Sequence, residues 1–118
     1  MLRSGNVFAG VWPAPAEETA TTLAARQGAF VERIVSTGQA SPPGFWYDQD
    51  WTEWVIVLMG EAGLRIEGEA AARTLQSGDW VELPAHVKHR VEWTLPHPPT
   101  VWLAVHWKGG AEAPRDQS

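Results

Sequence analysis

The chain has 118 residues, which is enough for one domain but not for two independent hydrophobic cores. Its composition is globular, with 44% hydrophobic and 19% charged residues, and the formal charge of -5 comes without a basic patch, so neither nucleic acid nor a membrane surface is expected as a partner. The absence of cysteine excludes disulfides and thiolate metal sites, and without an apolar stretch long enough for a signal peptide or a membrane helix, the expected compartment is the cytoplasm.

Residues 1–28 are predicted to form an N-terminal extension with one short helix. The segment 17–26 contains good helix formers and has acidic residues in its first turn, directly after the helix-breaking run Pro13-Ala14-Pro15. We therefore expect the helix to cover residues 17–26.

From residue 29 onwards, short strand-like segments alternate with glycine- and proline-containing turns. The predicted strands cover residues 29–37, 51–60, 63–68, 72–76, 80–83, 87–95 and 100–107. Strands this short at close intervals are typical of an all-β sandwich or barrel. We expect one β-barrel domain over residues 29–108, followed by a polar tail, residues 109–118.

The segment 53–59 is apolar on both faces of a strand. One face should fill the interior, and the other must be covered by the N-terminal segment or by a second subunit. A homodimer is the expected arrangement.

His89 is the first candidate for a functional residue. Strand alternation places His89, Val91 and Trp93 on one face and the charged Arg90 and Glu92 on the other, so His89 should point inwards. Each ring nitrogen of a buried histidine needs a partner, so His89 is either a hydrogen-bonded core histidine or a metal ligand. The pattern alone favours the first reading.

The stretch GFWYDQDWTEW, residues 44–54, crowds acidic and amide groups around aromatic rings. Glu53 stands out because it precedes an uncharged run, where burial of a carboxylate is costly unless a cation or a hydrogen-bond donor compensates it. The alternative is a solvated carboxylate at the end of a strand.

These two stretches resemble the paired sequence motifs of the cupin superfamily. Glu53 and Gly60, with six residues between them, match the second half of the first motif, and Gly78, Pro84 and His89 match the second. The resemblance covers roughly residues 32–107. It implies a small, jelly-roll-like double-stranded β-helix barrel.

The chain departs from the family pattern at the metal ligands. The His-x-His positions of the first motif fall on Trp46 and Asp48, or on Tyr47 and Gln49, depending on the spacing. The glycine of the second motif's Pro-x-Gly is His86, and its closing asparagine is Trp93. The resemblance therefore implies a divalent metal ion (zinc, iron, manganese or nickel) whose ligands come from Glu53, His89, Asp48, Gln49 and His86.

The resemblance further implies a metal-dependent enzyme of dioxygenase, isomerase or decarboxylase type that acts on a small organic molecule inside the barrel. Its pocket would be walled by Trp46, Tyr47, Trp51 and Trp93. A non-catalytic small-molecule binding or sensor barrel without a metal is the alternative, favoured by the missing histidines, and a barrel with a relic pocket is the third possibility.

The two remaining histidines carry weaker signals. On the last strand, the purely apolar face holds Val101, Leu103, Val105 and Trp107, so His106 is expected to point outwards. If the faces are reversed, His106 joins the pocket. His97 is expected to be a solvated turn residue.

Overall fold

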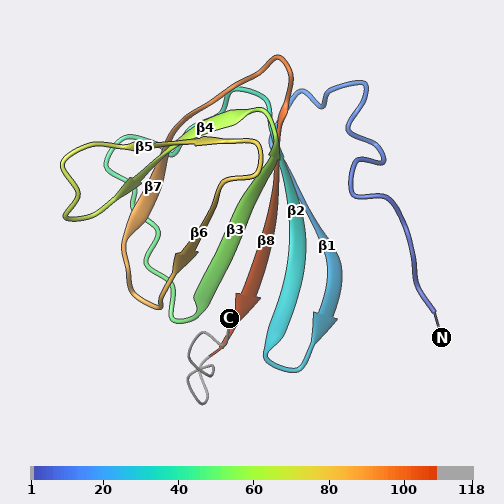
Figure 1. Ribbon diagram of the computed structural model, residues 1–118, viewed down its shortest axis with the longest axis horizontal. Helices are drawn as coiled ribbons and strands as arrows, with labels where there is room; N and C mark the ends of the chain where they lie inside the picture. The colour runs from blue at the N-terminus through green and yellow to red at the C-terminus, as the bar shows by residue number, and fades with distance from the viewer. Residues whose placement is uncertain (1, 109–118) are drawn as a thin grey trace.

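A computed structural model describes residues 2–108, which form two antiparallel β-sheets that face each other (Figure 1). One sheet has the strand order β1-β2-β8-β3-β6 and the other β5-β4-β7. The strands are β1 (Thr19–Arg26), β2 (Ala29–Ser36), β3 (Thr52–Met59), β4 (Glu61–Ile66), β5 (Arg73–Gln76), β6 (Trp80–Leu83), β7 (His89–Thr94) and β8 (Thr100–Trp107). The predicted polar tail, residues 109–118, lies outside the described residues.

The segment predicted as a helix is strand β1, so that prediction is wrong. It pairs with β2 along its whole length through a tight turn, in which Gly28 has a φ of 79°. The threonines at positions 19, 21 and 22 are β-branched and favour a strand, and pairing with the adjacent strand overrides the helix propensity of the alanines. Among residues 2–108 there is no helix with the length and hydrophobicity needed to cross a membrane.

The sheets form an open jelly-roll sandwich rather than the closed barrel that was predicted. Figure 1 shows β4, β5 and β7 packed over the larger sheet, and the ladder of one sheet does not continue into the other. Because β1 extends the larger sheet beyond β2, the sequence-based boundary at residue 29 cuts through a hairpin of this sheet.

The core lies between the sheets and takes alternate residues from each strand. On β3 the buried positions are Glu53, Val55 and Val57, and on β8 the inner face carries Ala104 and His106. The expectation that His106 points outwards is therefore wrong. The wholly apolar face of β8 is the outer one.

An extra residue in β7 changes which side chains face the core. Gly63 pairs with Trp93, but its neighbour Leu64 pairs with Val91, so Glu92 has no partner on β4. The indole of Trp93 lies over Gly63, where an added Cβ would collide with the indole Nε1. The prediction that Trp93 shares the inner face with Val91 is wrong because this bulge reverses the alternation.

The N-terminal segment covers one end of the outer face of the larger sheet. Val11 is fully buried and packs against Val35 and Val101. Arg33 donates hydrogen bonds to two backbone carbonyls of the same segment. The N-terminal segment, one of the two covers predicted for this face, thus lies over this end of it. The other, a second subunit in a homodimer, stays a prediction.

Candidate functional site

A pocket of about 130 Å³ opens between the two sheets. Its polar lining consists of Glu18, Glu32, Tyr47, Gln49, Glu53, His89 and His106, and aliphatic side chains and Trp102 complete it. We call it the acidic pocket, because three carboxylates face the same small space.

The register of the larger sheet places these groups side by side. Phe30 on β2 pairs with His106 on β8, and His106 pairs with Glu53 on β3. Side chains at directly paired positions lie about 5 Å apart at Cβ, so Glu53 and His106 are neighbours on the inner face. Glu32 lies two residues from Phe30, on the same face.

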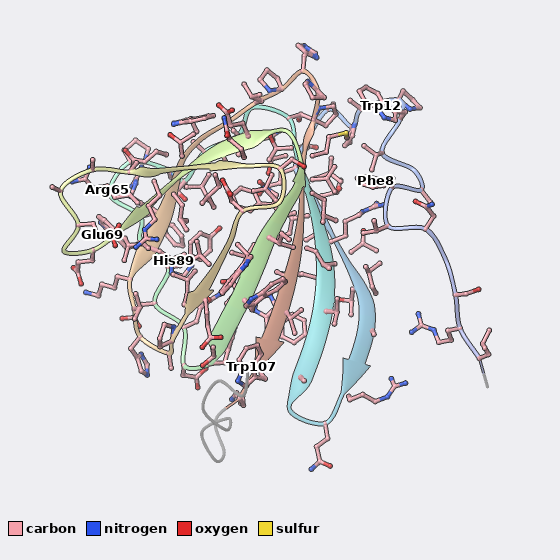
Figure 2. The ribbon with its side chains drawn as sticks, in the orientation of Figure 1. Phe8, Trp12, Arg65, Glu69, His89 and Trp107 are labelled. Atoms are coloured by element: carbon pink, nitrogen blue, oxygen red, sulfur yellow. The ribbon has the colours of Figure 1, made fainter. Side chains whose placement is uncertain are left out.

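His89 reaches the acidic pocket from the opposite sheet (it is labelled in Figure 2). Its Nε2 lies 3.5 Å from Oε1 of Glu53, and both side chains are largely buried. Its Nδ1 donates a hydrogen bond to the carbonyl of Val87 at 3.0 Å, which fixes the ring orientation and turns Nε2 towards Glu53. The ring also stacks on Tyr47, with the centroids 5.3 Å apart.

The pKa of His89 is raised above its ordinary value. Burial by itself lowers this pKa, but the hydrogen bond to Glu53, the hydrogen bond to the Val87 carbonyl and the charge of Glu53 together raise it by more. His89 therefore keeps its proton to a higher pH than a free imidazole. It is a proton donor held against a carboxylate.

We expect the free energy of unfolding to fall as the pH rises through the folded-state pKa of His89. Because this pKa is higher in the folded than in the unfolded state, the protonated ring stabilises the fold fully below the unfolded value, and this contribution is lost above the folded one. Urea unfolding of the wild type and of Glu53→Gln between about pH 5 and 9 measures the effect. The variant should show a flatter dependence, whereas Asp48→Asn should follow the wild type. Equal slopes for the wild type and Glu53→Gln would refute the assigned cause.

The pKa of Tyr47 reports the charge of the acidic pocket. It is raised by burial and then by the charges of Glu18, Glu53 and Glu32. Glu18 accepts a hydrogen bond from the Ser36 hydroxyl at 2.6 Å, which holds its carboxylate in place. A space with this lining favours cations and hydroxyl donors and disfavours anions.

His106 is held in one tautomer by its two partners. The indole N–H of Trp51 donates to Nδ1 at 2.9 Å, and an indole can only donate, so Nδ1 carries no proton. Nε2 therefore carries the proton and donates to Oε1 of Glu32 at 3.0 Å. The ring stacks on Phe30 at 4.2 Å. Because both nitrogens are engaged, His106 orients Glu32 and offers no lone pair to a ligand.

The predicted metal ligands do not come together as one set. Asp48 and His86 bind each other at 2.8 Å on the surface, where their side chains are 43% and 68% exposed. Gln49 lines the pocket with Glu53 and His89, but residues 2–108 contain no group of three His, Asp or Glu side chains placed to hold one ion. Protein sites for zinc and related metals use at least three protein ligands. The donor set, as arranged, does not fit such a metal.

The predicted aromatic walls are only partly in place. Tyr47 lines the acidic pocket, and Trp51 lies behind His106. Trp46 lies under the guanidinium of Arg90 at 5.9 Å, and Trp93 covers Gly63. Neither of these two indoles lines the acidic pocket.

Two pocket carboxylates, Glu18 and Glu32, are absent from the sequence-based prediction. Glu18 lies in the segment that was predicted as a helix. Glu32 could have been found from the sequence, because it lies on the same strand face as Phe30 and Ile34 and so places a charge on an otherwise apolar face.

Comparison with known proteins gives matches among solved structures only. No family model matches the sequence, and neither does any curated protein. A protein of Ralstonia eutropha JMP134, described as a candidate mannose-6-phosphate isomerase, is 50% identical, with a TM-score of 0.88 over 92% of this chain and 100% of its own. An RmlC-like cupin of Desulfovibrio desulfuricans is 15% identical, with a TM-score of 0.71 over 91% of this chain and 97% of its own. KdgF of Halomonas sp. is 17% identical, with a TM-score of 0.66 over 82% and 84%. The last two show the fold alone.

Proposed function

This chain belongs to the cupin superfamily, and we propose that its acidic pocket isomerises a small hydroxylated carbonyl compound, such as a sugar, by proton transfer. The observation that carries the proposal is the placement of His89 Nε2 at 3.5 Å from Glu53 Oε1 in a buried, polar pocket. The 50% identity to a protein described as a candidate sugar-phosphate isomerase supports the same reaction class.

An isomerisation of this kind needs an acid and a base in one pocket. The base removes a proton from the hydroxyl-bearing carbon beside the carbonyl, and the acid protonates the carbonyl oxygen, which gives an enediol. The removed proton then returns to the former carbonyl carbon while the other hydroxyl loses its own, so no atom is gained or lost. Two titratable groups in opposite protonation states are the requirement.

His89 and Glu53 fill these two roles. The raised pKa of His89 keeps a proton on Nε2 for the carbonyl oxygen, and the charge of Glu53 that helps to raise it makes that carboxylate the base. Glu32, oriented by His106, accepts hydrogen bonds from substrate hydroxyls. No step is assigned to a metal, because the donors for one are not assembled.

The test is solvent proton exchange. The protein is incubated in D₂O with a panel of aldoses, ketoses and their phosphates, including mannose 6-phosphate, with and without a chelator, and is followed by NMR. We expect deuterium at the carbon beside the carbonyl, interconversion of the isomers, and no loss of either after chelation. If no compound exchanges, or if activity vanishes with the chelator and returns with added metal, the proposed mechanism is wrong.

The second candidate is a non-catalytic binding protein. It is favoured by the surface position of Asp48 and His86, which leaves the family's usual metal set incomplete. In the same panel it would show saturable shifts of pocket resonances without any exchange.

A further inference from the structure

A second pocket lies beside the acidic one, at the end of the β1–β2 hairpin. Its volume is about 400 Å³, and its floor is aromatic and aliphatic, with Phe30, Trp51 and Trp107 among the lining residues (Trp107, at the end of β8, is labelled in Figure 2). Arg26 and Lys108 also line it. We call it the hairpin pocket.

The two pockets meet at His106, which lines both of them. The ring of His106 is fixed between Trp51, Glu32 and Phe30, so it forms a rigid divider. Because Phe30 and His106 are paired on neighbouring strands, the hairpin pocket reaches the inner face of the larger sheet at these two residues, while Ala29 and Trp107 line it from the outer face at the sheet's end.

The size of the acidic pocket limits how much of a ligand it can hold. A cavity of about 150 Å³ in another protein holds one benzene molecule, so a space of about 130 Å³ takes about six heavy atoms, fewer than a sugar has. A sugar-sized molecule must therefore extend beyond it. The hairpin pocket adjoins it, because His106 lines both spaces.

The charges of the two pockets are opposite. Three carboxylates line the acidic pocket, and they repel an anionic group. In the hairpin pocket, one guanidinium nitrogen of Arg26 donates a hydrogen bond to the carbonyl of Ala25, and the other N–H groups of this side chain are left to bind a ligand. Lys108 lies 3.6 Å from Asp50, but both side chains are well exposed, so this ion pair is weak and exchangeable.

We infer that the hairpin pocket binds an anionic group, a phosphate or a carboxylate, at the far end of the ligand whose hydroxylated end enters the acidic pocket. Arg26 supplies a fork of N–H donors, and Lys108 supplies a second positive charge. The aromatic floor packs against the carbon chain that joins the two ends. Identifying the other end as hydroxylated rests on the proposed function, whereas the anion site stands on the charges and the shape of the hairpin pocket.

The test uses inorganic phosphate as the probe and the indole N–H signal of Trp51 as the reporter. This N–H is bonded to His106 at the boundary of the two pockets, so its NMR signal should move as phosphate is added. The double variant Arg26→Gln/Lys108→Gln should weaken phosphate binding at least tenfold. The matched variant Arg3→Gln/Lys88→Gln removes the same charge outside the hairpin pocket and should leave binding unchanged. Acetate, titrated in the same way, distinguishes a carboxylate site from a phosphate site.

The outcomes separate this inference from the proposed function. If the double variant binds phosphate as the wild type does, or if phosphate leaves the Trp51 signal unmoved, the anion site is refuted even where exchange is observed. If phosphate binds as expected but no sugar or sugar phosphate exchanges, the anion site stands and the proposed function falls. With an active protein, the double variant should raise KM at least tenfold for a phosphorylated substrate and leave it unchanged for the unphosphorylated one.

Discussion

Replacing His89 with glutamine is expected to lower kcat by two to four orders of magnitude, the range that general acid–base groups supply. Glutamine is similar in size and polar, so it should preserve the packing around Glu53, but it cannot deliver a proton to the substrate. Glu53→Gln should have a comparable effect, because it removes the base and also lowers the pKa of His89. Steady-state kinetics on the most active compound of the panel measures both effects.

The exposed pair of Asp48 and His86 is the matched control for this prediction. It has the same chemistry as the buried pair, with its imidazole and carboxylate 2.8 Å apart, but it faces solvent. His86→Gln and Asp48→Asn should keep activity within about twofold, since surface ion pairs contribute little. A loss in these variants equal to that of His89→Gln would place the chemistry elsewhere.

The pH profile gives a second readout that a purely structural role would not move. The acid must be protonated at the start of the reaction, so kcat/KM should fall as the pH rises through the pKa of His89 in the free protein, which lies above the ordinary imidazole value. An alkaline limb below the ordinary imidazole value would contradict the assignment of His89 as the acid.

The pocket could be predicted from the sequence where local spacing decides the geometry. Glu53 stands at the start of an apolar strand, and His89 shares a strand face with Val91, so both were identified before the structure placed them near each other. Alternation is reliable here because no bulge separates His89 from Val91. It fails at Trp93, two residues after Val91, because the extra Glu92 turns Trp93 outwards, and nothing in the residue types marks that bulge.

The face of His106 was predicted wrongly for a different reason. An apolar strand face is normally the inner one, but on β8 the inner face carries His106 as part of a polar pocket. One end of the apolar outer face is covered by the N-terminal segment, where Val11 packs against Val101. A polar pocket thus breaks the rule that assigns the core from hydrophobicity.

The link between Glu32 and His106 spans 74 positions in the sequence and depends on the pairing of β2 with β8. Strand order and register are tertiary properties that no local pattern contains. Glu18 was missed along with its segment, because alanine-rich strands and helices look alike until a neighbouring strand provides hydrogen bonds. Glu18 and Glu32, two of the three carboxylates of the pocket, were therefore the least predictable part of the site.

The second large effect is expected from Gly60→Ala, which should lower the free energy of unfolding by about 2–5 kcal/mol. Gly60 lies between β3 and β4, where the chain leaves one sheet for the other, and it has a φ of 87°. An added Cβ would lie 2.7 Å from the Cα of Thr100 and 2.9 Å from the carbonyl oxygen of Pro99, so it would strike backbone that cannot swing aside. Urea unfolding of the variant and the wild type measures the loss.

Gly68→Ala separates the two causes of this loss. Gly68 has nearly the same conformation, with a φ of 93°, but nothing lies within 4 Å of an added Cβ. Its variant should lose only the conformational part, about 1–2 kcal/mol. The excess loss in Gly60→Ala then measures the contact with Thr100, whose hydroxyl hydrogen-bonds to the backbone of Glu61 and Leu95. Equal losses in the two variants would mean that the chain does not pass close to Thr100 where it crosses between the sheets. The position assigned to β3, and therefore to Glu53, would then be wrong as well.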